Sequence, residues 1–141
     1  MSTTTATRKT LKPKAKAPGP IPTSRELWDA TTIADQRRLC ARASGAKRYR
    51  HPILAELGAC TGARLYCSFY PTMQEAIQRC TVHAWMEWLA AMAPITFDAR
   101  ESYVDATCAL YVKARDSEIT GRQHTAALRK LTLRALGSRT P

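Results

Sequence analysis

The sequence is short of acidic residues and has no long apolar run, and each shortage excludes a class of protein. It holds 11 Asp and Glu against 22 Lys and Arg, a formal net charge of +11. This charge favours an anionic partner such as nucleic acid, and less often a membrane surface. Because no run of about 18 apolar residues occurs, we expect no membrane span. No apolar segment follows the N-terminal charges, so we expect no secretory signal, and the prolines there argue against a mitochondrial transit peptide.

Catalytic signatures are also missing. The sequence contains no G-x-S-x-G, no Walker A and no H-E-x-x-H motif. Its three histidines, His51, His83 and His124, are scattered, so each is interpreted as a surface or hydrogen-bonded residue rather than a catalytic base. We therefore expect a protein that is not an enzyme and that takes no cofactor.

Close-spaced cysteine pairs, which structural zinc sites commonly use, are absent as well. Cys80 and His83 are spaced i, i+3 and, with Cys60 and Cys67, form the one candidate zinc set, Cys60, Cys67, Cys80 and His83. Against zinc, Cys60 and Cys67 are separated by six residues, and Cys80 continues an apolar helical stripe. Buried thiols are the preferred interpretation of the five cysteines. The zinc site and a disulfide between two of the cysteines are the other two interpretations.

Helical periodicity dominates the rest of the chain. The stretch Thr72–Met92 repeats apolar residues at three- and four-residue steps, and Glu75 follows Thr72 at the spacing of a capping box. We predict one helix here, around which the others pack. Its apolar end, Trp85 to Met92, is a candidate contact between protomers if other parts of the same chain do not cover it.

A second capping-box spacing, Thr23 to Glu26, predicts a helix over residues 24–43, either continuous or divided at Thr31-Thr32. The side chains expected to face the core from it are Leu27, Trp28, Ile33, Ala34, Leu39 and Cys40.

Three further helices are predicted along the chain. A short one begins at Pro52 and ends at Gly58. A longer one begins at Asp98 as N-cap, with Glu101 at box spacing, and reaches Arg115. The last runs from about residue 122 or 125 to Leu136.

Residues 58–70 fit a packed loop, a short strand or a broken helix equally well. Residues 1–22 are basic and rich in proline and threonine, and they read as an extended arm with nothing to bury. The predicted fold is all-α: a four- to five-helix bundle over residues 23–141 with an extended basic N-terminal arm.

The basic residues are segregated from the acids. Most of them lie in three blocks, residues 1–25, 37–50 and 122–141, none of which contains Asp or Glu. A generic solvated surface mixes the two signs, so we interpret the blocks as contacts to a phosphate polymer. The predicted nucleic-acid-binding residues are Arg8, Lys9, Lys12, Lys14, Lys16, Arg25, Arg37, Arg38, Arg42, Lys47, Arg48, Arg50, Arg122, Arg129, Lys130 and Arg134.

In outline the whole chain resembles the helical capsid (nucleocapsid) proteins of filamentous viruses, including those of archaea. The resemblance is carried by the basic arm Arg8–Lys16, the spacer Pro18–Pro22 and the helices from Ser24 onward. It implies a structural protein that packages a genome by sequence-independent contacts and assembles with itself into a filament or capsid. The sequence leaves DNA and RNA both open as the partner, and we expect DNA ahead of RNA. The expected location is then a virion, or the cytoplasm or nucleoid.

Two alternatives stay open. The chain could be a small helical DNA-binding regulator or accessory protein of a mobile element, with a helix-turn-helix formed by Thr31–Ala43 and the segment that begins at Pro52. The arm could instead be a solubilising tail.

Overall fold

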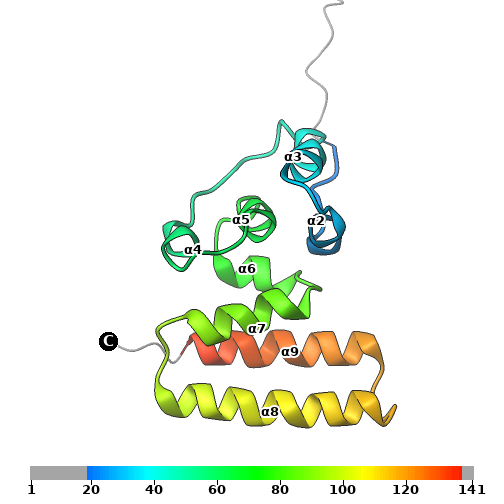
Figure 1. The fold of residues 1–141 in the computed structure, drawn as a ribbon, viewed down its shortest axis with the longest axis vertical. Helices are drawn as coiled ribbons and strands as arrows, with labels where there is room; N and C mark the ends of the chain where they lie inside the picture. Colours follow the sequence, from blue (N-terminus) through cyan, green and yellow to red (C-terminus); the bar gives the residue numbers. More distant parts are fainter. Residues whose placement is uncertain (1–18, 138–141) are drawn as a thin grey trace, which may run out of the picture.

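The computed structural model describes residues 19–137, and every regular element in that range is a helix (Figure 1). In chain order the helices are α2 (Ser24–Asp29), α3 (Ile33–Ala41), α4 (Pro52–Glu56), α5 (Thr61–Cys67), α6 (Met73–Gln78), α7 (His83–Met92), α8 (Phe97–Arg115) and α9 (Gly121–Leu136). The all-α prediction is confirmed for residues 19–137, whereas the count of four to five helices is wrong, since eight are present there. The predicted arm residues 1–18 lie outside the described range.

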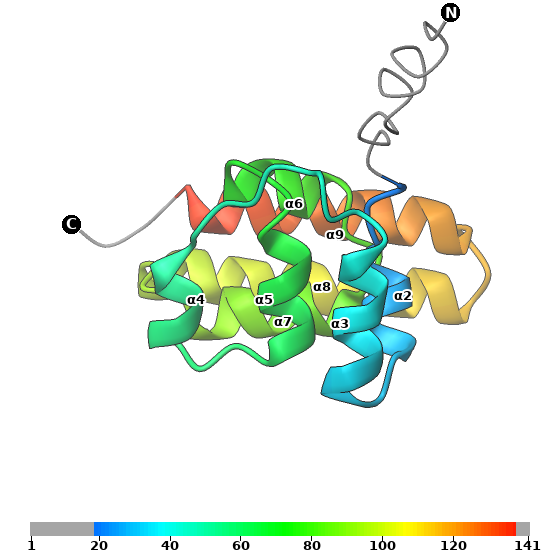
Figure 2. The same cartoon turned by 90° about the horizontal axis from the view of Figure 1, so that it is seen from above.

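The helices are arranged along one long axis. In Figure 1, α8 lies at one end of this axis, side by side with the antiparallel α9, and α3 lies at the other end. Helix α9 packs against α6, α7 and α8, while α5 packs against α2, α3 and α6. Seen from above, α3, α4 and α5 form the near side of the molecule (Figure 2).

The core joins segments that are far apart in the sequence. Leu27 of α2 and Leu128 of α9 are both fully buried, and Met86 of α7 is 1% exposed. Tyr66 of α5 is also buried, and its hydroxyl donates to the backbone oxygen of Ala76 in α6 at 2.6 Å. This bond satisfies a phenol that burial would otherwise leave without a partner.

The predicted single helix over residues 72–92 is wrong, because the chain breaks between α6 and α7. Val82 is extended and precedes α7, and β-branched residues at positions 81 and 82 weaken helix continuation. The freed backbone groups find distant partners: Ser24 Oγ accepts the Thr81 N–H at 2.8 Å, and Arg129 Nε donates to the Cys80 oxygen at 2.7 Å. The break is therefore held by α2 and α9.

The helix predicted over 24–43 divides at Thr31-Thr32 into α2 and α3, the second of the two options. Thr32 caps α3, its hydroxyl accepting the Asp35 N–H at 3.1 Å. Ile33 of α3 and Trp28 of α2, both expected inside, are 50% and 46% exposed. Trp28 still packs edge-on against Trp85, with 5.9 Å between the ring centroids. Ala34 is exposed too, whereas Leu27 and Cys40 are buried as predicted.

The remaining boundaries follow local chemistry. Helix α4 gives way to Gly58, whose φ of 82° suits glycine. The segment 58–70, whose structure the sequence left open, contains the short helix α5. Thr96 rather than Asp98 caps α8, because its hydroxyl accepts the Ala99 N–H at 3.2 Å. Helix α9 begins at Gly121, after a capping box formed by Thr120 with Gln123.

Candidate nucleic-acid interface

Three of the predicted phosphate-binding arginines meet a carboxylate instead. Arg25 lies 3.8 Å from Asp29, Arg38 lies 2.6 Å from Asp35, and Arg42 lies 2.7 Å from Glu26. The acids stand just outside the acid-free blocks in the sequence, and the helices bring them back to the arginines. The expectation of unneutralised blocks therefore fails for these three cations.

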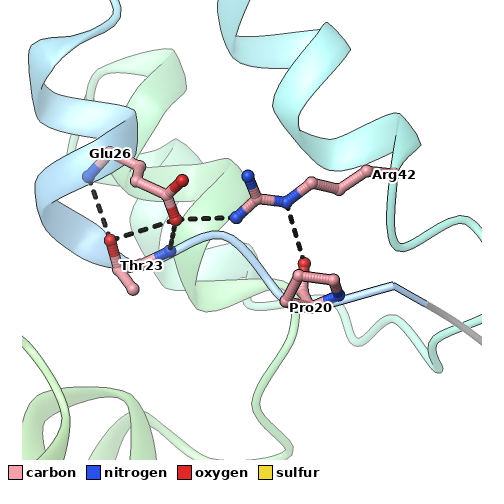
Figure 3. Close-up of polar contacts among 4 residues, drawn as sticks. All are labelled: Pro20, Thr23, Glu26 and Arg42. Carbon is pink, nitrogen blue, oxygen red and sulfur yellow. Dashed lines mark hydrogen bonds and ion pairs between the residues drawn. The ribbon is translucent and has the colours of Figure 1, made fainter.

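Arg42 makes polar contacts with Pro20 and Glu26, close to the start of α2 (Figure 3). Its guanidinium donates to Glu26 Oε1 and, through Nε, to the Pro20 oxygen at 3.0 Å. The Arg42 hydrogen bond, with the Thr23 N–H next in importance, lowers the pKa of Glu26 from its ordinary value of 4.5 to about 2. The Gly19 N–H also donates to the Arg42 oxygen at 3.0 Å. Arg42 thus holds the backbone of Gly19 and Pro20 beside α2 and α3.

Two more predicted cations have structural contacts. Arg129 is half-buried through its bond to the Cys80 oxygen, so it does not face outward beside Lys130 as the sequence predicted. Arg48 donates to Ser68 Oγ at 2.7 Å, and its guanidinium lies 4.1 Å from the centroid of the Phe69 ring. Both side chains hold a loop against a helix.

A second set of arginines is gathered around a cleft. Arg37 of α3, Arg50 of the α3–α4 connection and Arg64 of α5 line a hollow of about 370 Å³. Its other lining residues are Tyr49, His51, Pro52, Ala55, Thr61 and Leu65. The three arginines are exposed, and within residues 19–137 none of them forms an ion pair. We call Arg37, Arg50 and Arg64 the cleft arginines.

The loop that carries Arg50 is fixed on α5 and the residues that follow it. The Tyr49 N–H donates to the Ser68 oxygen at 2.7 Å. His51 Nε2 lies 3.0 Å from the Cys67 oxygen and 2.9 Å from the Tyr70 oxygen. Because both neighbours are acceptors, we assign the His51 proton to Nε2. Arg50 is therefore presented from a backbone held on both sides.

The cleft has the chemistry of a phosphate site. Guanidinium groups donate two parallel hydrogen bonds to phosphate oxygens and stay charged at any physiological pH. Three of them beside one hollow with no lining carboxylate repel one another until an anion enters. The volume falls within the range of about 300–1,000 Å³ found for small-molecule sites, enough for a phosphate with its sugar.

Sequence reasoning found two of the cleft arginines and missed the third. Arg37 and Arg50 belong to the block 37–50, whereas Arg64 lies in the segment 58–70, whose structure the sequence left open. Only the α5 helix shows that Arg64 meets the other two. Among the remaining predicted cations, Lys47, Arg122, Lys130 and Arg134 are exposed and form no ion pair within residues 19–137. Arg8, Lys9, Lys12, Lys14 and Lys16 lie outside that range.

The candidate zinc residues do not form a metal site. Cys60, Cys67 and Cys80 line an apolar cavity of about 310 Å³, and His83 instead lies 2.7 Å from the Thr125 hydroxyl. In the described range no three His, Cys, Asp or Glu side chains could hold a metal ion, and the five cysteines are free thiols. Burial raises the pKa of the Cys67 thiol to about 12, which keeps it protonated and unreactive.

The other histidines make contacts between helices. The ring centroids of His83 and His124 are 4.6 Å apart, and Tyr111 packs edge-on against His124 at 4.7 Å. Burial, followed by the neighbouring His124, lowers the pKa of His83. These rings join α7, α8 and α9.

Across residues 19–137, no helix is both long and apolar enough to cross a bilayer. No protein-family model, no curated protein and no solved structure matches this chain.

Proposed function

We propose that this chain is a structural nucleic-acid-binding protein that coats a genome by sequence-independent phosphate contacts and assembles with itself into a filament or capsid. The observation that carries the proposal is the cleft, where three arginines from three elements face one hollow without a carboxylate. No catalytic residue is needed for this role, so we propose a non-enzymatic protein.

The residues favour phosphate binding over base reading. Contacts to phosphate fix the position of a protein on the polymer, whereas sequence is read by side chains that reach base edges. The cleft arginines are held around a hollow and do not project from one continuous helix, as a groove-reading element requires. Lys47, whose Nζ lies 5.4 Å from the centroid of the Tyr49 ring in the cleft lining, and the basic arm add charge that carries no sequence information. DNA is the first polymer to test, and RNA the second.

Fluorescence anisotropy tests the proposal with two unrelated duplexes of equal length at several salt concentrations. We expect similar affinities for both and a steep fall with salt, since each phosphate contact contributes about 0.9 to the logarithmic slope on duplex DNA. A flat salt response, or a strong preference for one duplex, would contradict a sequence-independent coat. Electron microscopy of the protein with long DNA should show extended particles.

A DNA-binding regulator remains a second candidate, although not with the helix-turn-helix expected from the sequence. Helices α3 and α4 are joined by residues 42–51, far longer than the three- to four-residue turn of that motif. One observation favours the candidate in another place: α2 and α3 are joined by residues 30–32 alone, and α3 exposes Arg37 and Arg38. A regulator would form a defined oligomer and prefer one site, which the same two-duplex titration detects.

A further inference from the structure

Helix α8 carries a second apolar face that packs on nothing within the described part of the chain. Tyr103 and Thr107 are buried toward the core, whereas Phe97 is 70% exposed, Val104 is 51% exposed and Cys108 is exposed. At 100° per residue the last three fall within about 40° of one another. Exposed apolar stripes of this kind mark contact surfaces.

Acids run beside this stripe. Asp98, Glu101 and Asp105 are exposed, lie on the same side of the apolar residues and form no ion pair within residues 19–137. In a chain of net charge +11 they make an acidic face on a basic protein. The surface that complements this face has to be basic and partly apolar.

The outer face of α9 meets that description. Helix α9 contains no acid. Lys130 and Arg134 are exposed and form no ion pair within residues 19–137, and Ala126 and Leu133 lie next to them on the helix surface. The four-residue step from Lys130 to Arg134 equals the step from Glu101 to Asp105, a rise of about 6 Å in each helix.

The heights of the two charged rows also agree. The Tyr103 hydroxyl lies 3.1 Å from the Thr132 hydroxyl, so residues 101–105 of α8 lie level with residues 130–134 of α9. The helices are antiparallel (Figure 1). When the α9 of a second copy lies antiparallel to this α8 with the same offset as within one chain, the two charged rows are at the same height. In that arrangement apolar meets apolar, and Glu101 and Asp105 meet Lys130 and Arg134.

We propose that the outer face of α8 docks on the outer face of α9 in a second copy of this chain. The contact uses a different surface on each copy, so each added copy brings a further α8 or α9 face, and the assembly grows beyond a dimer into a ring or a filament. The inference rests on the proposed self-assembly and names its surfaces. The elements that carry the cleft arginines, namely α3, α5 and the α3–α4 connection, lie away from α8 along the long axis (Figure 1), so the cleft stays free for nucleic acid.

Charge reversal on one face at a time tests the contact. Glu101→Lys/Asp105→Lys makes α8 basic, and Lys130→Glu/Arg134→Glu makes α9 acidic, all at exposed positions. We expect sedimentation velocity of the full chain without nucleic acid to show concentration-dependent association for the parent and at least a tenfold weaker association for each variant alone. Circular dichroism checks that both variants are folded.

Mixing the two variants in equal amounts provides the decisive readout. The basic α8 of one then faces the acidic α9 of the other, so we expect the mixture to regain the association of the parent chain, an outcome that damaged folding cannot produce. A parent chain that stays monomeric, variants that associate like the parent, or a mixture that stays dissociated overturns the docking. Failure of the coat function alone appears separately, as absent binding of a short duplex by a parent chain that still associates.

Discussion

Two neighbouring regions use arginine in opposite ways. Arg38 pairs with Asp35 within α3, and Arg42 at the end of α3 pairs with Glu26 of α2, whereas the cleft residues Arg37 and Arg50 form no ion pair within residues 19–137. Arg37 and Arg38 are adjacent in the sequence and still belong to different regions, because consecutive helical residues point about 100° apart. A basic block in a sequence therefore gives the number of charges, and the fold decides which of them remain available to a partner.

The largest difference in stability between replacing a cation that has a partner in the chain and replacing one that has none is expected within α9. Arg129→Gln leaves the Cys80 oxygen without its half-buried donor, and we expect a loss of about 1–3 kcal/mol in the free energy of unfolding. Its neighbour provides the matched control, because Lys130→Gln should change stability by no more than about 0.5 kcal/mol. Urea denaturation of both variants measures the contrast, and equal losses would remove it.

A smaller difference in the free energy of unfolding is expected between the Arg42→Gln and Arg37→Gln variants. Arg42→Gln breaks the ion pair with Glu26 and the bond to the Pro20 oxygen. Since the pair is about one-third exposed, the expected loss is about 0.5–1 kcal/mol. Arg37→Gln should leave the urea midpoint unchanged and weaken duplex binding instead. If Arg42→Gln weakened duplex binding as much as Arg37→Gln, the distinction between paired arginines and cleft arginines would be wrong.

The ion pair between Glu26 and Arg42 should make the stability of the chain fall at low pH. The pKa of Glu26 in the folded chain is about 2, below the ordinary 4.5, so the unfolded chain binds more protons between these values. The contribution of Glu26 to stability is complete above about pH 4.5 and is lost as the pH falls through 2. Urea midpoints at pH 5, 4 and 3 should fall more steeply for the parent chain than for Glu26→Gln. Parallel curves would show that Arg42 does not hold the carboxylate.

The smallest effect on folding is expected in the cleft. Arg50→Gln removes one of three unneutralised charges, so we expect no loss of thermal stability, and a slight gain at low salt as repulsion is relieved. A thermal melt at two salt concentrations measures this. A clear loss would mean that Arg50 has a structural partner and does not belong with the free cations.

The sequence predicts the elements whose signals are local. The Thr23–Glu26 box and the end of α4 before Gly58 depend on residues within one turn, and both are present as predicted. The division at Thr31-Thr32 is also present, and it is one of the two options that the sequence left open. The break between α6 and α7 could not be predicted in the same way. Its backbone groups are satisfied by Ser24 and Arg129, which are distant in the sequence.

The candidate site could also be predicted only in part: two of its charged residues were found from the sequence, but their tertiary contacts were not. Charge patterning identified Arg37 and Arg50 as basic residues of one block. Charge patterning could not predict that Arg64 lines the same cleft, nor that Arg38 and Arg42 pair with carboxylates. Both contacts depend on how α2, α3 and α5 fold and pack. Counting charges in sequence windows cannot recover pairings made by tertiary structure.

Duplex binding by two charge-matched triple variants tests the central claim most directly. Arg37→Gln/Arg50→Gln/Arg64→Gln removes the cleft arginines, and Arg25→Gln/Arg38→Gln/Arg115→Gln removes three arginines that each pair with a carboxylate. We expect the cleft variant to reduce the magnitude of the slope of log K against log salt by about 2–3 and the paired variant to leave it nearly unchanged. Equal reductions in the two variants would contradict the account, since binding would then follow total charge and not the cleft.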